Sequence, residues 1–89
     1  MPTISAFYGI TIRIFCEKNI KHNLMHFHAY YNEYSCVVDI NSCELINGDM
    51  PIKQRKLILA WAEIHKDRLL KNWKIVQSNG TPFKIKPLS

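Results

Sequence analysis

The sequence lacks paired cysteine motifs and long apolar runs. Its three cysteines are an odd number and none lies in a Cys-x-x-Cys pair, which argues against a disulfide framework or a four-thiolate zinc site. The two longest stretches without a charged residue, 1–12 and 22–32, are both too short to cross a bilayer, and 22–32 is also rich in His, Asn and Tyr. The start of the chain has no basic segment followed by a long apolar one, so no signal peptide is expected. We therefore expect a soluble, cytoplasmic protein with reduced thiols.

The chain is also short and poor in acidic residues. Its 89 residues are too few for a two-domain enzyme, a (β/α)8 barrel or a complete dinucleotide-binding domain. Twelve Lys and Arg against seven Asp and Glu give a formal charge of +5 with His neutral. Residues 1–45 carry three bases and four acids, and residues 46–89 carry nine bases and three acids. This asymmetry favours an anionic partner, a nucleic acid or an acidic protein, but it also fits a solvated helical surface.

The hydrophobic pattern has a period close to two before Asn47, which predicts β-strands. We expect strands at about 10–14, 25–31 and 34–40 and a short fourth one at 43–46. A short extended piece precedes them, with a bend or bulge at Tyr8-Gly9. Tight turns are expected at Asn32-Glu33 and Asn41-Ser42, because Asn tolerates a positive φ.

After Asp49-Met50-Pro51 the period changes to about 3.6, which predicts helix as far as about Gln77, with Asn79-Gly80 as the C-cap. Such a length is unusual in a small domain. We therefore expect one kinked helix or two consecutive helices that meet near His65–Asp67, with Asp67 available as a cap.

The tail, residues 81–89, either returns as an edge strand or packs along the surface. The sequence thus predicts one α+β domain over residues 1–89. It would consist of an antiparallel three- to four-stranded meander (1–47), a helical half (48–80) and a short extended tail.

The densest group of functional side chains lies on the strand predicted over 25–31. Alternation along a strand places His26, His28 and Tyr30 on one face and Phe27 and Ala29 on the core face.

The two predicted turns also set a cross-strand row. A two-residue turn at 32–33 places His26 opposite Asp39, and a second one at 41–42 places Asp39 opposite Glu44. A carboxylate at cross-strand distance could hold one imidazole tautomer or stabilise the charged ring.

Three functions could use this face. His26 or His28 could act as general acid or base with Asp39, while Arg13 stabilises a phosphate, as in RNA cleavage. The two histidines could share a metal, with Asp39 or His22 as a third ligand, although no fourth ligand is evident. The same side chains could instead serve recognition, by stacking on bases or by packing in a protein interface. The alternative without a function is that the histidines are ordinary exposed strand residues or pack beneath the helix.

The predicted helix separates an apolar side, with Trp61, His65 and Trp73, from a charged side. We interpret these three residues as core, with His65 hydrogen-bonded to backbone or to a carboxylate. Candidate nucleic-acid contacts are Arg13, Lys53, Lys56, Lys71 and Lys74. Neighbouring Glu63 and Asp67 partly neutralise that side, which favours a salt-bridged surface.

Several ordered segments resemble the small prokaryotic family catalogued as domain of unknown function 4160. These segments are Met1–Ser5, Phe7–Ile10, Ile12-Arg13, His26–His28, Trp61–His65, Leu69–Trp73 and Ile85–Leu88. The family typically shows an acidic residue before its first His and a Pro-Pro pair before His-Phe-His, where this chain has Lys21 and Leu24-Met25. The resemblance therefore carries over to Arg13, His26 and His28 but not to His22.

Genes of this family often lie beside one for another small protein, in arrangements that resemble toxin–antitoxin modules. The resemblance thus implies a small acidic protein partner and an RNA or DNA target, with a ribonuclease-type toxin as the enzymatic version. The other classes are a non-enzymatic regulator or antitoxin and a metal-binding protein that uses His26 and His28. No cofactor is expected, and self-association is left open.

Overall fold

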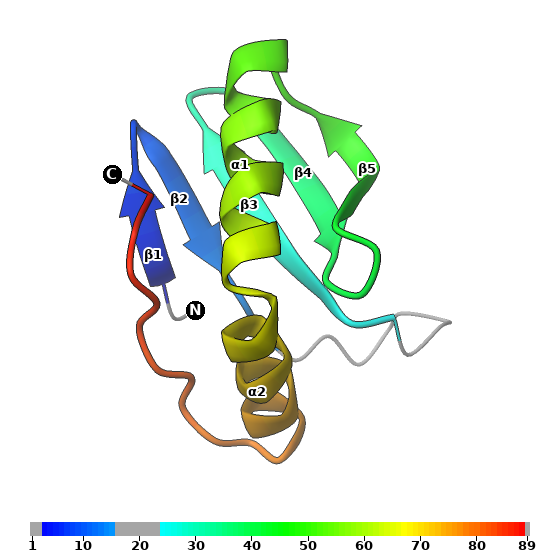
Figure 1. Ribbon diagram of the computed structural model, residues 1–89, viewed down its shortest axis with the longest axis vertical. Helices are drawn as coiled ribbons and strands as arrows, with labels where there is room; N and C mark the ends of the chain where they lie inside the picture. Colours follow the sequence, from blue (N-terminus) through cyan, green and yellow to red (C-terminus); the bar gives the residue numbers. More distant parts are fainter. Residues whose placement is uncertain (1–2, 16–23, 89) are drawn as a thin grey trace.

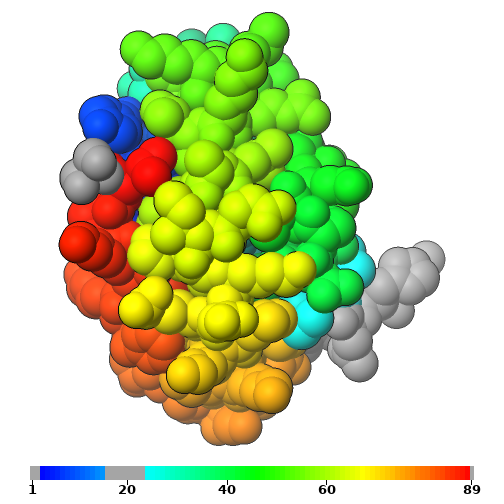
Figure 2. All heavy atoms as spheres, viewed as in Figure 1, coloured from blue at the N-terminus to red at the C-terminus, as the bar shows by residue number. Residues whose placement is uncertain are grey.

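The computed structural model describes residues 3–15 and 24–88, which form a layer of sheet and a layer of helix (Figure 1). The elements are β1 (Thr3–Phe7), β2 (Ile10–Arg13), β3 (His26–Tyr31), β4 (Tyr34–Asp39), β5 (Glu44–Asp49), α1 (Ile52–Ile64) and α2 (Lys66–Gln77). All neighbouring strands are antiparallel and follow the chain order. The α+β class is confirmed, and the strand number is five rather than three or four. The helices cross one face of the sheet, with the tail on one side and β5 on the other (Figure 2).

The N-terminal strand β1 was underestimated by the sequence pattern. Tyr8-Gly9 is neither a bend nor a bulge but the two-residue turn that joins β1 to β2. Both residues have a positive φ, 49° and 78°, as a type I′ turn requires. The bulge lies instead at Ile4, which has no partner between the pairs Thr3–Arg13 and Ser5–Ile12.

The hairpin of β3 and β4 has the predicted register. His26 faces Asp39 and Tyr31 faces Tyr34 across the strands. Asn32 adopts a φ of 52°, so the turn places its left-handed residue at Asn32 rather than at Glu33.

The connection from β4 to β5 is longer than predicted, yet it keeps the register. Cys43 N donates to the Asp39 carbonyl at 2.8 Å, and the loop has four residues, 40–43, where a two-residue turn at 41–42 was predicted. Asp39 still pairs with Glu44, as predicted. Strand β5 then continues to Asp49, so the boundary predicted at 46–48 is wrong. A bulge makes this possible: Val37 pairs with Asn47 and Val38 with Leu45, which leaves Ile46 as the extra residue.

The helical segment is broken at one residue, as predicted. His65 lies between α1 and α2 with φ −109° and ψ 22°. Its N–H still donates to the Trp61 carbonyl, and its own carbonyl accepts from Leu69 N. Asp67 lies in the first turn of α2 and makes no side-chain cap hydrogen bond. Pro51 is the N-cap residue of α1, and the helix begins at Ile52.

The end of α2 is capped as the sequence indicates. Asn79 has a φ of 62°, its N–H bonds the Val76 carbonyl, and Gly80 N–H bonds the Ile75 carbonyl at 2.8 Å. This pair of bonds is the Schellman pattern with Asn at the left-handed position.

The tail packs along the surface and forms no strand. It runs beside β1 (Figure 1), where Ile85 N donates to the Ile4 carbonyl at 2.7 Å. Pro87 follows two residues later and has no N–H to continue the ladder. The fully buried Asn72 holds the tail from α2, because its amide both donates to the Phe83 carbonyl and accepts from Phe83 N at 2.9 Å.

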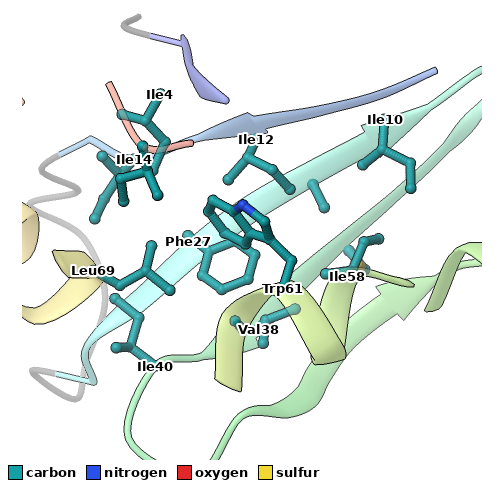
Figure 3. Packing of buried hydrophobic residues seen from close by; sticks show 14 of the residues in the cluster. Ile4, Ile10, Ile12, Ile14, Phe27, Val38, Ile40, Ile58, Trp61 and Leu69 are labelled. Carbon is teal, nitrogen blue, oxygen red and sulfur yellow. The ribbon is translucent and has the colours of Figure 1, made fainter. Parts of the chain in front are cut away.

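The core lies between the sheet and the helices and centres on Trp61 (Figure 3). The Trp61 ring packs at 5.7 Å, centroid to centroid, from Phe27 and at 5.5 Å from Phe7. Its Nε1–H donates to the Lys86 carbonyl at 2.9 Å, so the core residue also fastens the tail. Phe27 and Ala29 are fully buried on this side, as the alternation predicted.

Candidate functional site

The face of the sheet away from the helices carries the predicted cluster. Arg13 on β2 is the cross-strand partner of His28 on β3. Tyr30 lies two residues further along β3 and Phe15 two residues beyond Arg13, so alternation directs all four side chains to this face. All four are half-buried. The predicted grouping of Arg13 and His28 is therefore confirmed.

The rings on this face form a continuous row. Phe15 stacks on His28 with centroids 4.6 Å apart and planes 15° apart. His28 and Tyr30 are parallel within 12° at 6.3 Å. Phe15 was not among the predicted site residues, although the alternation that placed Arg13 on this face also extends to Phe15.

Arg13 caps this row at Tyr30. Its guanidinium carbon lies 5.4 Å from the centre of the Tyr30 ring, within the range of a cation–π contact. Its Nε is shielded from solvent and has no hydrogen-bond partner in the described part of the chain. The contact holds a positive charge at one end of the aromatic row.

His26 is the candidate whose surroundings differ most from prediction. It is only 2% exposed, because α2 extends past the ends of β1 and β2 (Figure 1) and Trp73 packs on it with centroids 5.1 Å apart. Its Nδ1 lies 2.7 Å from the Leu24 carbonyl; a carbonyl only accepts, so Nδ1 carries a proton. The ring also lies 5.3 Å from His28. His26 therefore packs against His28 from the buried end of β3, and it is too enclosed to contact a substrate.

Asp39 occupies the predicted cross-strand position but serves a turn. Its Oδ1 accepts from Asn41 N at 2.8 Å and from Ser42 N at 3.4 Å. This pattern is an Asx turn, in which the side chain replaces a backbone acceptor. The row His26–Asp39–Glu44 exists in the register, but the carbonyl of Leu24 fixes the imidazole tautomer.

The predicted nucleic-acid contacts do not form one site. Lys53, Lys56, Lys71 and Lys74 are all exposed on the helices, in the layer opposite Arg13. The described strands contain no Lys, and Arg13 is the one Arg on them.

The described residues offer no metal centre or reactive thiol. Residues 3–15 and 24–88 contain no group of three or more His, Cys, Asp or Glu that could hold an ion. Burial raises the pKa of Cys36 to about 11, although Arg55 opposes the shift. The pKa of Cys43 is raised by burial and by the nearby Glu63. Both thiols therefore stay protonated at neutral pH. Cys16, Lys21 and His22 lie outside the described residues.

His65 is a buried histidine of the core, as predicted, and it is hydrogen-bonded. Arg68 Nη1 lies 3.3 Å from its Nδ1; because Arg can only donate, Nδ1 is the acceptor and the ring is neutral. The partner is thus a guanidinium, where backbone or a carboxylate was expected. Burial lowers the pKa of His65, and the charges of Arg68 and Lys86 lower it further.

The lowered pKa of His65 predicts an acid-sensitive stability. Because the folded state disfavours the imidazolium, the unfolded chain binds the proton more readily between the two pKa values. The contribution of His65 to the free energy of unfolding should be fully present above pH 6.5, the ordinary pKa of the group. As the pH decreases from 6.5 to the pKa of the folded state, this contribution should be lost. Urea titrations between pH 7.5 and 5 measure this dependence. His65→Gln keeps an acceptor for Arg68 without titrating, so its curve should be flatter; parallel curves would contradict the assignment.

The sequence was compared with models of known protein families, with curated proteins and with solved structures. Residues 9–74 match the family described as Domain of unknown function (DUF4160). The chain belongs to this family. The match contains β2 to β5, α1 and most of α2, and thus Arg13, His26 and His28. Comparisons with curated proteins and with solved structures found no match. In the described part of this DUF4160 protein, no helix has the length and apolar character needed to span a membrane.

Proposed function

We propose that this DUF4160 protein is a cytoplasmic binding component of a two-protein module of toxin–antitoxin type. Its cognate partner, a small acidic protein, docks on the face of the sheet opposite α1 and α2. The observation that carries the proposal is the row Phe15–His28–Tyr30 with Arg13 at its end.

The composition of this face favours a protein over a nucleic acid. Aromatic residues and Arg are enriched in the centres of protein interfaces, and Lys is depleted. A nucleic-acid backbone is held by several cations, whereas Arg13 is the one Lys or Arg on the described strands and Asp39 and Glu44 lie on the same face. A carboxylate of the partner would pair with Arg13, and its apolar surface would cover the rings.

RNA is the second candidate ligand, and a different surface favours it. The exposed cations of α1 and α2 lie on the opposite layer of the molecule from Arg13. They are Lys53, Arg55, Lys56, Arg68, Lys71 and Lys74. With this arrangement the protein could hold a partner on the sheet and RNA on the helices.

The structure leaves fewer candidate catalytic residues for a ribonuclease than the sequence predicted. His26 is enclosed and Asp39 is bound to a turn, so a ribonuclease mechanism has only His28 and Arg13 at the surface. These two can supply one proton-transfer group and one phosphate contact. Growth arrest on induced expression that persists unchanged in His28→Ala would exclude this version and leave the binding function intact.

The binding function is tested with the product of the neighbouring open reading frame. The two proteins are co-expressed and their affinity is measured by calorimetry. Truncating an interface hot-spot residue, most often Trp, Tyr or Arg, costs about 2 kcal/mol or more, which is about 30-fold in Kd. We expect Tyr30→Ala and Arg13→Ala each to weaken the complex by roughly that factor.

Lys71→Ala on the outer face of α2 is the matched control and should bind as the wild type does. The proposal is wrong if the two sheet variants bind normally, or if only the helix variant loses affinity. Circular dichroism of each variant checks that a loss of binding does not come from unfolding.

A further inference from the structure

A hollow of about 410 Å³ lies where the β1–β2 turn and β3 meet the first turns of α1. It is lined by Tyr8, Tyr31, Lys53, Gln54 and Leu57. Because Tyr30 faces the side of the sheet opposite α1 and α2, its neighbour Tyr31 faces the helices. The hollow is therefore separate from the row that Arg13 ends, and its volume lies in the range of small-molecule sites, about 300–1,000 Å³.

Tyr8 is an unusual choice for its position. It has a φ of 49° at the first position of the turn, where Asn, Asp and Gly are preferred. Its side chain is 60% exposed, so burial in the core does not account for the ring. Neither local structure nor packing explains this aromatic residue, which stands at the edge of the hollow.

Tyr31 forms a fixed wall on the other side. A Cβ on Gly9 would lie 3.3 Å from Tyr31 Cε1, so the glycine lets the ring rest against the turn. Tyr31 and Leu57 are both half-buried and pack against the core. The wall and the floor of the hollow are therefore held by the fold.

The remaining lining is polar and cationic. Lys53 is exposed and Gln54 is half-buried, and no acidic residue lines the hollow. The carboxylate of Asp49, at the end of β5, is outside the lining and accepts from Met50 N at 3.0 Å. An anionic group of a ligand could therefore pair with the ammonium group of Lys53, and no carboxylate in the lining would repel it.

We propose that this hollow binds a nucleotide. The tyrosine rings offer faces for stacking with the base, the Gln54 amide can donate to and accept from its edge, and Lys53 pairs with the phosphate. The same chemistry is presented by a free nucleoside monophosphate and by the phosphorylated terminal nucleotide of an RNA. The site does not depend on the docking of a protein partner on the sheet.

The test is calorimetry of the whole protein with AMP, adenosine, inorganic phosphate and a 5′-phosphorylated RNA hexamer. AMP should bind, and adenosine and phosphate should each bind at least 10-fold more weakly. Equal affinity for AMP and the hexamer identifies a free nucleotide as the ligand; clearly tighter binding of the hexamer identifies an RNA end. No binding of AMP or the hexamer at millimolar concentration overturns the proposal.

Tyr8→Asn separates binding from folding, because Asn suits the left-handed turn better than Tyr. This variant should be at least as stable as the wild type and yet bind AMP about 10-fold more weakly, within the range for a lost stacking contact. Lys53→Gln should also weaken the binding of AMP, whereas Lys56→Gln, on the same helix but not among the lining residues, should not. Unchanged AMP affinity in both Tyr8→Asn and Lys53→Gln contradicts the site. Partner binding by these variants stays normal, so the two proposals fail or stand separately.

Discussion

Replacing Trp61 with Ala is expected to lower the free energy of unfolding by about 3–5 kcal/mol, as for other buried Trp and Phe. Domains of this size have roughly 5–15 kcal/mol in total, so the substitution removes between about a fifth and all of the stability. The reason is that Trp61 is completely buried and packs with Phe7, Phe27 and His65 at centroid distances of 5.5, 5.7 and 5.6 Å. Urea denaturation followed by circular dichroism measures the loss.

Trp61→Phe separates packing from the hydrogen bond to the tail. Phe retains most of the aromatic surface but cannot donate to the Lys86 carbonyl, which Trp61 Nε1 contacts at 2.9 Å. We expect a smaller loss, about 1–2 kcal/mol, with faster hydrogen exchange in the tail at Ile85 than in the sheet. An equal loss in Trp61→Ala and Trp61→Phe would mean that the hydrogen bond, not the packing, dominates.

The parts of the fold that the sequence predicted well are governed by local chemistry. Asn32 tolerates a positive φ and thereby fixes the register of β3 and β4, so the pairing of His26 with Asp39 follows from one turn. Asn79-Gly80 ends α2 for the same kind of reason. The break at His65 followed from the length of the helical pattern.

The parts that differ depend on contacts between distant segments. Strand β1 is short and gains its place from β2 on one side and from the tail on the other. Strand β5 runs through Asn47 and Gly48, which read as a turn locally, because a bulge opposite Val37 keeps them paired with β4. Neither effect is visible in the periodicity of the segment itself.

The candidate site shows the same division. Alternation was enough to place Arg13, His28 and Tyr30 on one face. Packing of His26 beneath the helix was one of the alternatives that the sequence left open, and the sequence could not decide it, because Trp73 is 47 residues away and reaches His26 only through the course of α2. The Asx turn of Asp39 was not predicted, because from the sequence Asp39 was considered only as the cross-strand partner of His26.

The distribution of charge between the two layers links these observations. Of the chain's twelve Lys and Arg, nine lie in residues 46–89, which include both helices and the tail. The described strands contribute Arg13 alone. A polyanion such as RNA would thus be attracted to the helices, whereas the aromatic row with Arg13 offers a protein partner apolar contact area and one group for a carboxylate. The sheet and the helices thus present surfaces of different chemistry on opposite sides of the described part of the chain.

Gly48→Ala is expected to be the most disruptive change outside the core. Gly48 has a φ of 88°, and a Cβ there would lie 2.3 Å from the Ser35 carbonyl oxygen and 2.7 Å from Cys36 Cα. These are backbone atoms of β4, so the clash is relieved only if β5 moves away from β4. Backbone strain and overpacking each cost about 1–3 kcal/mol, and we expect roughly 2–5 kcal/mol in urea denaturation.

Gly9→Ala is the matched control, because Gly9 has a similar φ of 78°. Its added Cβ would meet only the Tyr31 side chain, at 3.3 Å, so the cost should be close to that of the left-handed backbone alone, about 1–2 kcal/mol. The difference between the two variants measures the clash with β4. In Gly48→Ala the amides of β5 should exchange hydrogen faster while those of β3 stay protected. Equal destabilisation by both substitutions would show that β5 adjusts without leaving the sheet, and that its bulge is more compliant than its geometry indicates.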